Sequence, residues 1–167
     1  HTPYVVYAVI GLCGLTFLWQ LGLGQDGMQR AAFGLGLIPG VVTGAAQLAP
    51  DLRLVPAWAT FVTSMFLHGS FLHLAGNLLY LWIFGNNIED RLGHQGFLVF
   101  YLVSGVAAAA AQIAPEPGST VPMIGASGAI SGVLGAYLVL YPRSRVVVFI
   151  PISFMLLHEI RAFWLLI

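Results

Sequence analysis

The thirty-five residues from Leu54 to Ile88 contain no Asp, Glu, Lys or Arg, and no other feature constrains the fold as strongly. A helix needs about 20 mostly apolar residues to cross a bilayer, because the hydrocarbon core is about 30 Å thick. Only 7% of the 167 residues are charged and 59% are hydrophobic, whereas soluble domains carry about 25% charged residues. The chain is therefore predicted to lie in a membrane and not to form a soluble domain.

Several further apolar runs have the length of a membrane span. The four clear spans are predicted at Tyr4–Leu23, Phe61–Ile88, Gly96–Ile113 and Ile124–Tyr141. None of these runs alternates in polarity, so helices are predicted and a barrel is not. A fifth span is expected to start at Val146, although Pro151 interrupts it. The predicted fold class is all-α, a polytopic helical membrane protein.

The segment 24–57 differs from the spans because it contains charges, glycines and prolines among its apolar residues. It is interpreted as a long ordered loop with short helical pieces at the membrane surface. Arg91, Arg143 and Arg145 fall on one side of the predicted topology, and Arg30 and Arg53 fall on the other. The positive-inside rule then places the N-terminus in the cytoplasm.

The two ends of the sequence both look cut, since it opens with His1 and stops at Ile167 within an apolar run. We therefore expect residues 1–167 to form one membrane domain, truncated at both ends. The scattered arginines form no basic patch for nucleic acid. The lone Cys13 excludes an intramolecular disulfide, and neither a metal site nor a cofactor is implied.

Polar side chains inside the second predicted span are candidates for function, because such groups are costly in lipid. His73 and Asn77 are four residues apart and share one helix face. On a continuous helix, His68 would point about 140° away from His73. The pair also fits interhelical hydrogen bonding without chemistry.

The sequence Gly125-Ala126-Ser127-Gly128-Ala129 opens the fourth predicted span. A serine at a helix start can present its hydroxyl beside backbone N–H groups that have no intrahelical acceptor, which suits an oxyanion. The same small residues also suit close helix packing, since Gly128 and Gly132 form a GxxxG pattern. The two interpretations are compatible.

Taken in order, these motifs resemble the rhomboid family of intramembrane serine proteases, bacterial type. The resemblance runs from about Trp58 to Arg145 and rests on the segments 68–77, 86–93 and 125–130. It implies a rhomboid-like bundle of six helices, with the sixth beyond the end of this chain. It also implies an intramembrane serine endopeptidase that cleaves single-span membrane proteins near the outer membrane surface.

The resemblance assigns a role to each motif residue. Ser127 would be the nucleophile, and His73, Asn77 and the N–H of Ser127 would form the oxyanion hole. Gly125 would keep the approach to Ser127 open. Gly128 and His68 would support the site from beside it. Glu89 and Arg91 would have a structural role in a loop.

Two departures from the family pattern qualify these roles. The family's base is a histidine on the sixth helix, so it is expected beyond Ile167, and His158 is not accepted as that base. Ser131 stands where some rhomboids have an aromatic residue that stacks on the base. The alternative function is therefore a proteolytically inactive rhomboid-fold protein, acting as an accessory or binding subunit of a membrane complex. A transporter is a distant third, since no inverted repeat is evident.

The expected partners are a transmembrane protein substrate, the lipid bilayer and, for the alternative, a larger membrane complex. The expected location is the bacterial inner membrane.

Overall fold

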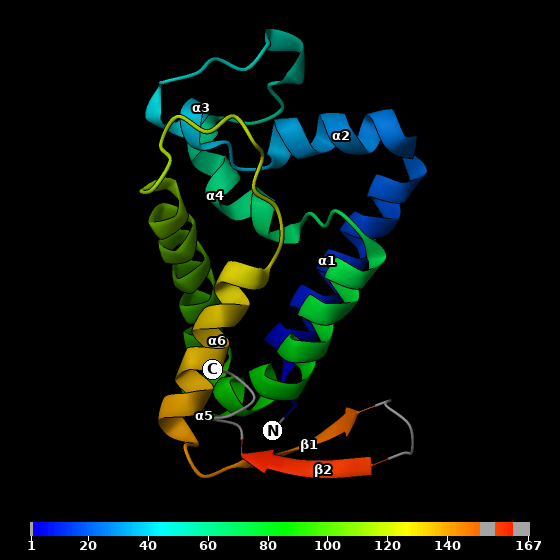
Figure 1. Ribbon diagram of the computed structural model, residues 1–167, viewed down its shortest axis with the longest axis vertical. Helices are drawn as coiled ribbons and strands as arrows, with labels where there is room; N and C mark the ends of the chain where they lie inside the picture. The colour runs from blue at the N-terminus through cyan, green and yellow to red at the C-terminus, as the bar shows by residue number, and fades with distance from the viewer. Residues whose placement is uncertain (1, 151–155, 162–167) are drawn as a thin grey trace. The chain divides into compact units, whose positions relative to one another are not determined.

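The computed structural model describes residues 2–150 and 156–161, and the side chains of residues 2–144. It divides into two units, residues 1–133 and 134–167, and each is described by itself. The elements follow the order α1 (Tyr4–Gly22), α2 (Gly24–Leu35), α3 (Pro39–Thr43), η1 (Pro50–Leu52), η2 (Ala57–Ala59), α4 (Thr60–Thr63), η3 (Ser64–Phe66), α5 (Phe71–Ile113), α6 (Ser127–Leu140), β1 (Arg145–Ile150) and β2 (Leu156–Arg161) (Figure 1).

Helix α1 matches the first predicted span. It packs along the first half of α5 (Figure 1). Its N-terminal turn is bound by Glu89, whose carboxylate oxygens accept hydrogen bonds from the N–H groups of Val5 and Val6 at 2.9 and 2.8 Å. A carboxylate suits this position, because the first N–H groups of a helix have no intrahelical acceptor and carry partial positive charge.

Helix α5 contains the second and third predicted spans, joined at a break. Gly93 has φ +72° and ψ 165°, a conformation outside the helical region that favours glycine. The chain bends back there, so that the two halves of α5 form a V (Figure 1). By length and composition, α1 and the whole of α5 are apolar enough to cross a membrane, and α6 is a shorter apolar helix.

The second span starts later than predicted. The structure begins α5 at Phe71 and not at residue 61, and residues 60–66 form α4 and η3 instead. The reason is local: the hydroxyl of Ser70 accepts a hydrogen bond from the N–H of His73 at 3.1 Å, which is an N-cap. The fourth helix likewise starts at Ser127 and not at Ile124.

The loop between α1 and α5 contains short helices, as predicted for residues 24–57. Its location at a membrane surface stays a prediction. The loop is attached to the segment that precedes α6: Leu37 and Met123 pair as an antiparallel bridge, with N···O distances of 3.0 and 2.7 Å. The N–H of Gly40 donates to the carbonyl of Ser119 at 2.8 Å.

The first turns of α6 pack on the second half of α5 through small residues. A β-carbon on Gly128 would lie 2.8 Å from Cβ of Ala108, and one on Gly132 would collide with the side chain of Ser104. This close approach is what the GxxxG pattern predicts.

The second unit corrects the prediction of a fifth span from Val146. Here β1 and β2 form an antiparallel pair, with Val148 opposite His158 and Arg145 opposite Arg161. The run from Val146 to Ile150 consists of β-branched and aromatic residues, which favour strands. The described part of this region therefore forms a strand pair and not the predicted helical span. The helical membrane fold predicted for the chain as a whole is confirmed.

Candidate active site

The N-terminal turns of α5 carry the first two candidate residues. Ser70 caps the helix, and this fixes His73 in its first turn with Asn77 one turn further on. His73 is half-buried, and Asn77 is buried. The Nδ2 atom of Asn77 finds no hydrogen-bond partner within the described part of the chain. A buried donor without an acceptor is costly in the resting protein, so it is suited to bind an anion that arrives later.

Gly125 lies directly against these two side chains. A β-carbon built on Gly125 would be 2.8 Å from Nε2 of His73 and 3.6 Å from Nδ2 of Asn77. Its backbone has φ +119°, where L side chains are strained. Its N–H donates to the carbonyl of Ser64 at 2.8 Å, which fixes the segment in front of α6. The structure thus brings the motif segments 68–77 and 125–130 together at Gly125.

Ser127 is the first residue of α6, two residues after Gly125, and its side chain is exposed. It lines a cavity of about 290 Å³ together with Gly125, Gly128 and residues of the second half of α5. The N–H groups of the first helical turn have no intrahelical acceptor. Ser131, one turn on, donates its hydroxyl hydrogen bond to the carbonyl of Ser127 at 2.8 Å. The Ser131 side chain is therefore engaged with its own helix.

His68 does not point away from His73, as the helical spacing predicted. The two rings meet edge to face, with centroids 5.2 Å apart. The prediction is wrong because Gly69 and Ser70 precede the helix, so helical angles do not apply to His68. Its side chain is completely buried. Burial, and then the neighbouring His73, lower the pKa of His68 to about 4, although the carbonyl of Phe66 opposes this shift.

Gln20 is a site-supporting residue that the sequence reasoning missed. Its side chain is 1% exposed, and it holds both backbone groups of His68. The amide Nε2 of Gln20 donates to the carbonyl of His68 at 3.2 Å, and Oε1 accepts from the N–H of His68 at 3.0 Å. The signal was present, since a lone amide in the first apolar span is the kind of polar group that marks function or structure in lipid.

Glu89 and Arg91 lie away from this cluster, at the break of α5. Glu89 binds the N-terminal turn of α1 and also contacts His94. The distance between Oε1 of Glu89 and Nδ1 of His94 is 2.6 Å. The sequence reasoning did not identify His94. Arg91 is exposed. Among the residues that the structure describes, no group of three or more His, Cys, Asp and Glu side chains is placed to hold a metal ion.

Comparison with known proteins identifies the class. The Rhomboid domain matches residues 56–167. The chain is 30% identical over 155 residues to "Rhomboid protein 1, mitochondrial" of Saccharomyces cerevisiae, covering 90% of this chain and 40% of that protein. It is 42% identical over 77 residues to "Rhomboid-like protein 11, chloroplastic" of Arabidopsis thaliana, covering 46% of this chain and 27% of the relative.

A bacterial relative is similar over a comparable stretch. The chain is 41% identical over 81 residues to "Rhomboid protease GluP" of Bacillus subtilis, covering 48% of this chain and 15% of that protein. The chain belongs to the rhomboid family, and with its apolar helices it is an integral membrane protein. It spans less than half the length of each of these three relatives.

Proposed function

We propose that this protein is an intramembrane serine endopeptidase that cleaves single-span membrane proteins near the outer membrane surface. The observation that carries the proposal is the closeness of the Gly125 backbone to His73 and Asn77, since a β-carbon added there would lie 2.8 Å from Nε2 of His73 and 3.6 Å from Nδ2 of Asn77. This closeness places the side chains of His73 and Asn77, both on α5, beside the segment that runs from Gly125 to the exposed Ser127. A packing interface alone does not require a buried amide donor without an acceptor.

In the proposed reaction, the hydroxyl oxygen of Ser127 attacks the carbonyl carbon of the scissile peptide bond. The carbonyl oxygen becomes an oxyanion, which accepts hydrogen bonds from His73, Asn77 and the N–H of Ser127. In serine proteases, removing one such hydrogen-bond donor lowers kcat about 10²–10³-fold. The C–N bond of the tetrahedral intermediate then breaks, and the base returns the proton that it took from Ser127 to the leaving amine. An acyl ester remains on Ser127, and its hydrolysis by water releases the acid and restores the hydroxyl group.

We assign the base that takes the Ser127 proton to none of the described residues. A serine hydroxyl is a weak nucleophile without an adjacent base. We expect this base to be a histidine beyond Ile167, and we do not assign it to His158. Gly128 and His68 support the site in this proposal, since Gly128 allows close packing of α6 and the ring of His68 contacts that of His73.

The proposed location is the bacterial inner membrane, with the N-terminus in the cytoplasm. The "Rhomboid protease GluP" relative comes from a bacterium, and the other two relatives have names that place them in organelles. Topology mapping by cysteine accessibility in segment 24–57 tests the orientation.

The deciding experiment uses the native full-length protein with a membrane-anchored reporter and a fluorophosphonate probe. We expect the wild type to cleave the reporter and to be labelled at Ser127, and Ser127→Ala to lose both. Ser131→Ala, which removes a hydroxyl one turn further along α6, is the matched control and should keep labelling. A correctly folded wild type that neither cleaves nor reacts would favour the alternative, an inactive accessory or binding subunit of a membrane complex.

A further inference from the structure

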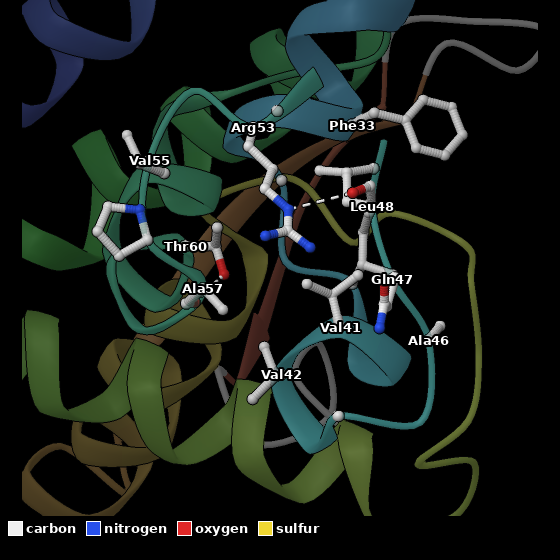
Figure 2. Close-up of a pocket in the computed structure, with 15 residues that line it drawn as sticks. Phe33, Val41, Val42, Ala46, Gln47, Leu48, Arg53, Val55, Ala57 and Thr60 are labelled. Carbon is white, nitrogen blue, oxygen red and sulfur yellow. Dashed lines mark hydrogen bonds between the residues drawn. The ribbon is translucent and has the colours of Figure 1, made fainter. Parts of the chain in front are cut away.

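A second cavity lies within the loop between α1 and α5, apart from Ser127. It has a volume of about 510 Å³, in the range of small-molecule sites. Its walls come from the end of α2, from α3 and from the segment 46–60, and most of the lining residues are apolar or glycine (Figure 2). None of these residues has a role in the proposed proteolysis.

One cation lies among these apolar residues. The side chain of Arg53 is exposed and lines the cavity, and in the view of Figure 2 its guanidinium lies among the lining side chains, above Val41 and Val42. Its Nε donates to the carbonyl of Leu48 at 3.1 Å, which fixes the orientation of the group. Within the described part of the chain, Arg53 has no carboxylate partner, and its two terminal NH₂ groups remain available. A guanidinium presents such groups as a fork that matches phosphate oxygens.

The other arginine of this loop, Arg30, differs from Arg53 because it has a carboxylate partner. Arg30 on α2 forms an ion pair with Asp51, with NH2 3.1 Å from Oδ2, and both side chains are well exposed at 63% and 66%. Arg30 and Arg53 therefore share the same loop and the same charge, but only Arg53 lines the cavity.

Exposed apolar side chains follow Arg53 directly in the chain. Leu54 is 57% exposed and Trp58 is 76% exposed. Tryptophan is enriched at the level of lipid headgroups, where its ring meets both apolar chains and water. A cation, an apolar cavity and an exposed tryptophan in one stretch match a ligand that has an anionic head and an apolar tail.

We propose that this cavity binds a phospholipid, with Arg53 holding the phosphate and the valine-lined part of the cavity holding the start of an acyl chain. The binding does not depend on the proposed protease activity. The bound phospholipid would anchor the loop to the membrane at one specific cavity. This differs from the general attraction between basic residues and an anionic membrane surface.

The test measures lipid binding to the purified full-length protein in an uncharged detergent, at fixed ionic strength. Dioctanoyl phosphatidylglycerol is titrated and its apparent Kd is taken from the shift of the thermal midpoint. Dioctanoylglycerol supplies the same chains without phosphate, and inorganic phosphate supplies the anion without chains. The variants are Arg53→Gln, the matched control Arg30→Gln, and Val42→Trp, which fills the cavity without changing the charge.

We expect Arg53→Gln to raise the Kd for phosphatidylglycerol about tenfold or more, as for the loss of a charge-assisted hydrogen bond. Val42→Trp should also weaken binding, and Arg30→Gln should leave it within twofold. Dioctanoylglycerol and inorganic phosphate should each bind far more weakly. The proposal is overturned if Arg30→Gln weakens binding as much as Arg53→Gln, or if Arg53→Gln binds like the wild type. The proposal is also overturned if inorganic phosphate binds as tightly as dioctanoyl phosphatidylglycerol, because the cavity would then be a site for anions and not for a lipid.

Discussion

Gln20 and His68 are joined by two reciprocal hydrogen bonds, in which one side-chain amide pairs with the N–H and the carbonyl of one backbone residue. The pair connects the last turn of α1 to the segment just before α5, 48 residues later. Because the ring of His68 contacts that of His73, α1 takes part in placing the candidate oxyanion hole.

Replacing Gln20 by Leu should destabilise the protein by about 2–4 kcal/mol, because it leaves two buried backbone groups of His68 without partners. The measurement is the unfolding free energy in detergent. Gln25→Leu removes an exposed amide from α2 and should change stability little. Equal stability of Gln20→Leu and the wild type would contradict the structural role given to this pair.

Adding a methyl group at Gly125 should disrupt the candidate site. The new β-carbon would press on His73 at 2.8 Å, and φ is +119°. We expect Gly125→Ala to lower kcat for reporter cleavage at least about 100-fold, since small displacements of catalytic groups have effects of this size. Gly76→Ala, where no atom lies within 4 Å of the new methyl, is the control. Normal turnover by Gly125→Ala would argue against this arrangement.

Glu89 should contribute to stability through both of its carboxylate oxygens. In Glu89→Gln one oxygen becomes an NH₂ group, which cannot accept a hydrogen bond from an N–H of α1, and the negative charge at the helix N-terminus is lost. A decrease of about 1–2 kcal/mol in the unfolding free energy is expected. Glu116→Gln, at an exposed position before α6, is the charge-matched control. The assignment would fail if both variants were equally stable.

Acidification should destabilise the protein through His68. The pKa of His68 is lowered from 6.5 to about 4 by burial and by His73. The folded state therefore binds the proton less readily than the unfolded state. The stability that His68 contributes is fully present above about pH 6.5 and is lost as the pH falls toward 4.

The check is the thermal midpoint of the wild type and of His68→Asn between pH 7 and pH 4.5. The difference between the two proteins should shrink or change sign as the pH falls. A difference that does not vary with pH would mean that His68 does not resist protonation in the folded state.

The helices could be predicted from the sequence because their signals are long. The α1 span and the second half of α5 follow from uninterrupted apolar runs. The start of α5 could not be placed, since the 35-residue run hides the cap at Ser70. The strand pair after Tyr141 could not be predicted from apolar length, which favours a membrane span, whereas the β-branched residues from Val146 to Ile150 favour a strand.

The candidate site could be predicted in part. His73, Asn77 and Ser127 came from two separate motifs, and the structure shows that Gly125 brings the first two to the segment that leads into Ser127. Gln20 and His94 were missed, because each acts on a residue that is distant in sequence or beyond a break in the helix. The pairing of Gln20 with His68 depends on how α1 packs beside the segment before α5. The contact of His94 with Glu89 depends on the break of the helix at Gly93. A local sequence pattern specifies neither partner.

The Glu89 cap has a consequence for the order in which the protein is made. Helix α1 is synthesised before α5, but the carboxylate that accepts the hydrogen bond from the N–H of Val5 is 84 residues further along the chain. Until the ribosome has added Glu89 and the first half of α5 has folded beside α1, the start of α1 must find its hydrogen-bond acceptors in water or lipid headgroups. Helix α1 is therefore completed only by a helix that is made after it, and its final position depends on that later helix.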